Sequence, residues 1–199
     1  MKTTTSLSAV IVFVCVFGLP LVARAQSEEV RLANEARDIV VQFTSTLKPR
    51  LLSAIEEGGL EHAVEVCASE APQIAAMLAL ESGWDVKRVS LRARNSSLAT
   101  PDAFERQVLE QFDAQQKNGE AAENMVYSRI EANQFRFLKA QGTEGLCLNC
   151  HGTSLSPALV SVLDRLYPDD QARGYALGEI RGAISLRHAL DSQHLLEDK

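Results

Sequence analysis

Apolar residues recur at steps of three and four along the first part of the chain, which is the spacing of one helix face. One stripe runs over residues 28–57 and a second over residues 60–78, with a pair of glycines between them. Pro49 and Pro72 interrupt the two stripes, so a kink or a break is expected at each, with Ser69 as a cap after the second break. The pattern therefore predicts a long helical region at the N-terminus.

After residue 84 the pattern changes to alternation, which predicts strands. Four segments alternate in this way: 85–94, 124–131, 134–140 and 180–186. The tight turn between the second and third segments predicts an antiparallel hairpin. Helices are expected after a Thr100 cap and over 157–166, and loops over 95–100 and 168–178. This order of elements predicts the α+β class with an antiparallel sheet.

The first residues have the pattern of a secretory leader. An apolar run over 9–22 precedes Ala23 and Ala25, which occupy the two positions that a signal peptidase reads. An uncleaved membrane anchor is the alternative, but the run is short for a membrane span. We therefore expect residues 1–25 to be a signal peptide and residues 26–199 to be one exported domain, located in the periplasm or outside the cell.

The charge balance narrows the choice of partners. The chain has 20 basic and 26 acidic residues and a net charge of −6, and without the leader the charge is −8. An acidic protein has no general attraction for nucleic acid or for anionic lipid. No other stretch looks long and apolar enough to span a membrane. We expect no nucleic-acid partner, and no membrane association after the signal peptide is removed.

One motif carries recognisable chemistry. Cys147-Leu148-Asn149-Cys150-His151 is a C-x-x-C-H sequence, the attachment signature of c-type haem. Two intervening residues let both thiols reach the two vinyl groups of one porphyrin, and the adjacent histidine then ligates the iron. The leader agrees with this interpretation, because c-type haem is attached outside the cytoplasm. The sequence predicts one covalent haem c, with Gly152 leaving room for the ring.

Other uses of this motif fit less well. A redox-active C-x-x-C normally opens a helix after a strand of a thioredoxin-like βαβ unit, which the pattern does not contain. A zinc site would need further ligands drawn from scattered positions. A plain disulfide would not explain His151.

The second axial ligand of the iron is open. The candidates by residue type are His62, Cys67, Met77, Met125, His188 and His194. The last two histidines lie in or near a polar tail and are expected to be solvated, and methionines are more often core residues than ligands. Cys67 is the odd thiol of the exported chain and lies on the apolar face of its helix. It is either a ligand or a buried inert cysteine.

The chain resembles an exported single-haem c-type family of unknown function, known from a cyanobacterial PAS-like haem protein. The matching segments are 63–67 with 71–75, 88–95 with Pro101, Asp102 and Glu105, then 147–152, Tyr167-Pro168, Gly174-Tyr175 and 178–185. The resemblance implies a PAS-like antiparallel sheet with a long N-terminal helix and flanking helices. It also implies iron held by His151 and Cys67. Ser96-Ser97 departs from the family pattern, which usually has a proline here.

Three functions are compatible with these observations. The first is a redox or sensory haem protein, with a redox partner or a small gas as ligand; a thiolate ligand would give the iron a low potential. The alternative is an electron-transfer cytochrome c. A haem peroxidase-like enzyme ranks last, because it needs a distal acid–base group that the sequence does not place. Several arginines could serve that site, pair with haem propionates or lie solvated: Arg88, Arg92, Arg94 and Arg136. The amphipathic N-terminal helix could also support a homodimer.

Overall fold

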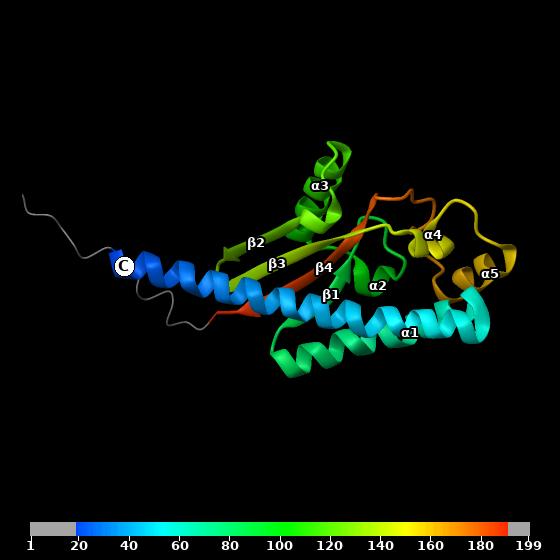
Figure 1. The fold of residues 1–199 in the computed structure, drawn as a ribbon, viewed down its shortest axis with the longest axis horizontal. Helices are drawn as coiled ribbons and strands as arrows, with labels where there is room; N and C mark the ends of the chain where they lie inside the picture. The colour runs from blue at the N-terminus through cyan, green and yellow to red at the C-terminus, as the bar shows by residue number, and fades with distance from the viewer. Residues whose placement is uncertain (1–18, 191–199) are drawn as a thin grey trace, which may run out of the picture.

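The computed structural model describes residues 19–190. Residues 1–18 of the predicted signal peptide and His194 therefore lie outside the described residues. The helix α1 begins at Leu19 and continues through the predicted cleavage point after Ala25. Figure 1 shows α1 running along one side of the molecule and then turning back on itself.

α1 (Leu19–Ser82) consists of two helices that meet at Gly59. This glycine has φ 77° and ψ −169°, a conformation that side-chain-bearing residues avoid, so the chain can reverse here. The predicted break at the glycine pair is confirmed. The predicted break at Pro72 is wrong, because both prolines lie inside the helices. Ser69 is not a cap: its hydroxyl donates back to the carbonyl oxygens of residues 65 and 66.

By length and composition alone, Glu28–Ser82 is long and apolar enough to cross a membrane. The expectation that no such stretch follows the leader is therefore wrong. A core helix passes the same test, and this one contributes Leu32, Phe43 and Ile74 to the core against the sheet.

Four antiparallel strands form one sheet in the order β1-β4-β3-β2. Their bounds are β1 Asp85–Val89, β2 Val126–Glu131, β3 Gln134–Gly142 and β4 Ile180–Ala189. The tight turn between β2 and β3 places Ala132 at φ 53°. The long helix, the flanking helices and the antiparallel sheet confirm the predicted α+β class.

Two strand ends differ from the prediction by about three residues or more. β1 ends at Val89 because the next backbone amide, of Ser90, donates to the carbonyl of Ala99 rather than to the sheet. β4 is longer than predicted and includes His188, whose ring stacks on Trp84 with centroids 4.8 Å apart. The expectation that this histidine lies solvated in a polar tail is wrong.

Helices cover both faces of the sheet (Figure 1). α1 packs on one face through a large apolar core that includes Phe135, Phe137 and Leu186 of the strands. α3 (Ala103–Lys117) packs on the other face through Val108, Leu109 and Phe112. A short 3₁₀ turn, η1 (Ala122–Asn124), leads from α3 into β2.

The predicted loop before α3 contains a short helix, α2 (Ser96–Ala99). The cap of α3 is Asp102 and not the predicted Thr100. The Asp102 carboxylate accepts from the Glu105 amide and the Glu105 carboxylate accepts from the Asp102 amide, each at 2.8 Å. This reciprocal capping box satisfies two backbone donors at once.

Glu105 is fully buried under the sheet and joins α3 to three strands. It accepts from the Ser185 hydroxyl at 2.7 Å, and Lys87 Nζ lies 2.9 Å from its second oxygen. Arg136 lies 3.5 Å away and also pairs with Asp102. Arg136 is buried on this face, so the expectation that it is solvated or meets the haem is wrong.

Two short helices lie at the end of the molecule where α1 turns back (Figure 1). α4 (Gly145–His151) follows β3 directly, and α5 (Pro157–Leu166) follows α4. α5 packs on the second arm of α1 through Val64, Leu159 and Leu163. A loop without regular structure then leads back to β4.

Candidate functional site

α4 explains the spacing of the C-x-x-C-H motif. Residues three and four positions apart lie on one face of a helix, so α4 presents Cys147, Cys150 and His151 on the same side. Both cysteines are free thiols and are half-buried. β3 before α4 and β4 after it are antiparallel neighbours. The motif is therefore not part of a parallel thioredoxin-like βαβ unit.

A cavity of about 1200 Å³ lies next to this face. Its walls come from both arms of α1, from β1, β3 and β4, and from α4. The wall on the second arm of α1 is made mainly of small residues: Ala63, Val64, Cys67, Ala68, Ala71 and Ala75. The cavity exceeds the range of about 300–1,000 Å³ that is usual for ligand pockets, so a large, flat group can enter it.

All four residues predicted to hold the iron and its porphyrin line this cavity. Cys147, Cys150 and His151 lie on the α4 wall and Cys67 lies on the α1 wall. Burial raises the pKa of the Cys67 thiol, while the nearby charges of Arg88 and Arg94 oppose that rise. Residues 80 positions apart in sequence thus meet across one cavity.

The other described candidates for the second ligand do not line the cavity. Met125 is buried in the core between α3 and the sheet, and Met77 is exposed on α1. His188 stacks on Trp84, and His62 packs next to Gly58. Within the described residues no three His, Cys, Asp or Glu side chains gather as a site for a metal ion.

The ring of His151 is held in one orientation and one tautomer. Its Nδ1 lies 2.7 Å from the carbonyl oxygen of Ala172. A carbonyl oxygen can only accept, so Nδ1 carries the proton and donates it. The lone pair is then on Nε2, the nitrogen that remains available to a metal. A hydrogen bond of this kind on the far nitrogen is the usual support of a ligating histidine.

Burial and the charge of Arg181 keep His151 neutral. The Arg181 Nε lies 3.1 Å from Nδ1 and 3.5 Å from Nε2 of the imidazole. Because Nδ1 already carries a proton, the guanidinium meets the ring as a positive charge. Burial, together with the charges of Arg181 and Arg94, lowers the pKa of His151 to about 2. Arg181 itself is buried and fixed by a 3.1 Å hydrogen bond to Ser90 Oγ.

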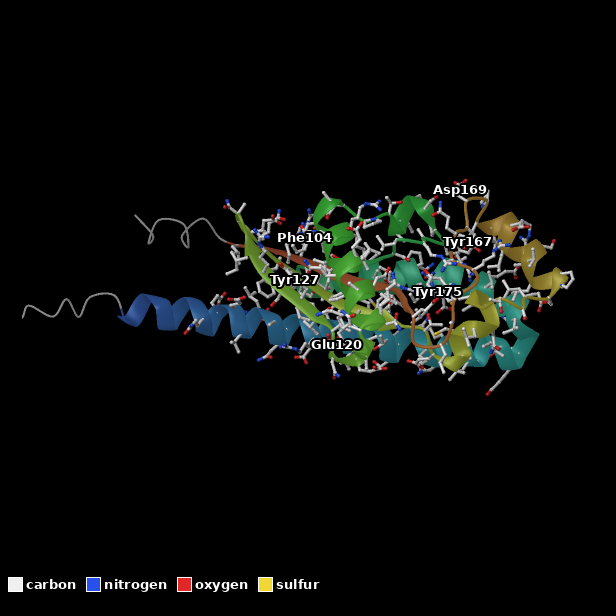
Figure 2. All side chains as sticks on the ribbon, turned by 90° about the horizontal axis from the view of Figure 1, so that it is seen from above. Phe104, Glu120, Tyr127, Tyr167, Asp169 and Tyr175 are labelled. Atoms are coloured by element: carbon white, nitrogen blue, oxygen red, sulfur yellow. The ribbon has the colours of Figure 1, made fainter. Side chains whose placement is uncertain are left out.

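The loop before β4 forms the support for α4. The amides of Gly174 and Tyr175 donate to the carbonyls of Gly152 and His151 at 3.0 and 2.9 Å. The Tyr175 ring meets the His151 ring edge to face at 6.3 Å. Figure 2 shows Tyr167 and Tyr175 at the end of the molecule that carries α4 and α5.

Arg94 and Asp170 connect the loop before β4 to the C-x-x-C-H motif through hydrogen bonds and an ion pair. Arg94 Nη2 donates to the Cys150 carbonyl at 2.5 Å and to the Ala172 carbonyl at 3.2 Å. Its Nε lies 3.3 Å from Asp170. Burial alone would raise the pKa of Asp170, but hydrogen bonding from Arg173 and the charge of Arg94 outweigh it and lower that pKa.

Gly152 is also required by the backbone at the end of α4. A Cβ on this residue would lie 2.6 Å from the Leu148 carbonyl oxygen, to which the Gly152 amide donates at 2.9 Å. Only glycine closes α4 in this way, directly after the histidine.

The residues that contact and orient His151 were not predicted from the sequence. Arg181 was present only as one letter of the family-like segment 178–185, and Tyr175 as one letter of a Gly-Tyr pair. Ala172 acts through its backbone carbonyl, which leaves no signal in the sequence. Arg92 lies over the Tyr175 ring at 4.1 Å and is not among the residues that line the cavity.

The fold and the site define a small α+β protein with a large cavity whose lining includes three cysteines and an oriented histidine. The chain belongs to the Tll0287-like family, whose model matches residues 21–188. The resemblance seen in the sequence is thereby confirmed. The solved structure of the cyanobacterial haem protein Tll0287 has a similar fold, with a TM-score of 0.58 and 24% identity over 78% of this chain and 95% of that one. No curated protein matches this chain.

Proposed function

We propose that this protein binds one covalent haem c through Cys147 and Cys150, with His151 and Cys67 as the iron ligands, and has a redox or sensory role outside the cytoplasm. The observation that carries the proposal is the meeting of all four residues at one cavity. The family relation supports it, because a structural relative is described as a haem protein.

The residues present fit a haem. The cavity is large enough and is lined mainly by apolar side chains, as a porphyrin requires. The two thiols lie on one face of α4, as attachment to two vinyl groups of one ring requires. The donor set of one neutral imidazole and one thiol is a known type of haem ligation. When bound, the haem would supply an iron that can change charge by one electron and accept a small gas.

The protein itself contributes orientation and electrostatics. Ala172 fixes the tautomer of His151, and Arg181 disfavours protonation of the ring that would block ligation. Arg94 holds the Cys150 backbone in place. The small side chains of the α1 wall around Cys67 leave space in the cavity for a flat ring.

Maturation with the c-type haem attachment system tests the proposal. Mass spectrometry should find one haem added to the mature chain, and the Cys147→Ala, Cys150→Ala double variant should lack it. Cys67→Ala should change the ferric absorption spectrum, because the thiolate ligand is lost. Met77→Ala, an exposed candidate on the same helix, is the matched control and should leave the spectrum unchanged. An unchanged spectrum for Cys67→Ala would remove Cys67 from the ligand set.

The same preparation separates a sensory role from simple electron transfer. Binding of carbon monoxide to the reduced protein would show that one ligand position opens, as a gas-responsive protein needs. A reduced protein that ignores carbon monoxide would favour the electron-transfer cytochrome.

A further inference from the structure

The cationic side chains that line the cavity are almost all engaged by the protein. They are Lys48, Lys87, Arg88, Arg94, Lys139 and Arg181. Lys48 and Lys87 pair with carboxylates at 2.9 Å each, and Lys139 donates to the backbone carbonyls of Ala122 and Glu123 in η1. Arg94 and Arg181 are held by the contacts around His151. The guanidinium of Arg88 has no hydrogen bond or ion pair with any residue between 19 and 190.

The position of Arg88 in β1 directs its side chain to the cavity. Neighbouring residues of a strand point to opposite faces of the sheet. Lys87 reaches Glu105 of α3 and Val89 packs in the α3-side core. Arg88 therefore points to the α1 face, where Cys67 lies on the opposite wall.

A half-buried guanidinium without a partner is costly, because it has lost part of its hydration and gained no anion in return. The charges around Arg88 add to this cost. Arg94 and Arg181 are also cations, and Asp170, the carboxylate that pairs with Arg94, is shared with Arg173. The arrangement is explained if the occupant of the cavity supplies the anion.

We propose that Arg88 binds a carboxylate of the haem; this inference rests on the proposed function. A haem tethered through its vinyl groups still carries two propionate carboxylates. The planar guanidinium fork matches a carboxylate through two parallel hydrogen bonds. Among the groups of the protein itself, the charge of the Cys67 sulfur acts most strongly on Arg88, and the experiment distinguishes this sulfur from a haem carboxylate.

The test measures binding of ferric mesohaem and of ferric mesohaem dimethyl ester to the full mature apoprotein. Mesohaem has no vinyl groups, so no thioether bond forms and affinity can be measured by absorption titration. The ester has no free carboxylate. The proteins are wild type, Arg88→Gln, Arg88→Lys and, as matched control, Arg129→Gln on exposed β2. Far-UV circular dichroism checks that each variant is folded.

Arg88→Gln should weaken mesohaem binding by about tenfold or more, the usual effect of losing a hydrogen bond to a charged group. The ester should bind wild type more weakly than mesohaem does, and Arg88→Gln should cause no further loss with the ester. Arg88→Lys should lose less than Arg88→Gln, and Arg129→Gln should match wild type.

Equal losses with mesohaem and with its ester would overturn the inference, because Arg88 would then act on Cys67 or on the fold. Unchanged mesohaem affinity in folded Arg88→Gln would overturn it as well. Failure of wild type to bind either porphyrin would instead overturn the proposed function, and this inference with it.

Discussion

Replacing His151 by asparagine should remove a large part of the acid sensitivity of the apoprotein. Burial and two neighbouring arginines lower the pKa of His151 from 6.5 to about 2 in the folded state. Below pH 6.5 the unfolded chain takes up a proton on this ring that the folded chain cannot accept. Stability is therefore lost as the pH falls from 6.5 towards 2, and the group has no effect at higher pH.

The size of the effect follows from the two pKa values. Each pH unit between them costs about 1.4 kcal/mol, so moving from pH 7 to pH 4.5 should lower the free energy of unfolding by about 2.5 kcal/mol through this residue alone. Asparagine does not titrate, and its amide can still donate to the Ala172 carbonyl. Urea unfolding of both apoproteins, followed by circular dichroism at the two pH values, measures the difference. The carboxylates titrate in both proteins, so their effect on the free energy of unfolding cancels in the comparison.

For a urea dependence of about 1–3 kcal/mol per molar, wild type should lose roughly 1 M more in its unfolding midpoint than His151→Asn between these pH values. Equal losses in the two proteins would refute the assignment of a buried neutral imidazole. The same result would contradict the role of Arg181 in keeping the His151 imidazole neutral and able to ligate a metal.

Three further substitutions test the packing of the helices and strands around the sheet. Gly182→Ala should destabilise the protein by about 2 kcal/mol or more, because a Cβ there would overlap the Val89 carbonyl oxygen. The thermal unfolding midpoint of the variant measures this loss, and an unchanged midpoint would contradict the strand geometry. Glu105→Ala should cost about 3–5 kcal/mol in urea unfolding, because it removes the buried carboxylate that accepts from Ser185 and pairs with Lys87 and Arg136, whereas exposed Glu110→Ala on the same helix should change little. Phe43→Ala should cost about 3–5 kcal/mol through a core cavity, and a loss no larger than that of its exposed neighbour Val41→Ala would refute the α1–sheet core.

Several expectations from the sequence depended only on local physics, and these agree with the structure. A helix face repeats every three to four residues, so the apolar stripes of α1 were visible without knowledge of their partners. The break at Gly59 follows from the backbone freedom of glycine, and the two-residue gap between the alternating segments predicted the turn at Ala132. The C-x-x-C-H spacing belongs to one helical turn, and α4 places its three side chains on one face.

Other expectations failed where tertiary contacts compete with local ones. Thr100 looks like a helix cap, but Asp102 makes the capping box because Glu105 is fixed under the sheet. His188 looks like part of a polar tail, but β4 continues because β3 offers a partner strand as far as Gln134.

The sequence by itself determined the helical stripes, the strands and the cysteine motif, because each depends on residues close together in the chain. Only the tertiary structure decided that Cys67 lines the same cavity as His151 and that Ala172 and Arg181 contact the imidazole. These partners lie 21 to 84 positions from His151, and Ala172 acts through a backbone atom that every residue has. Folding alone brings such groups together, so no local pattern could encode their meeting.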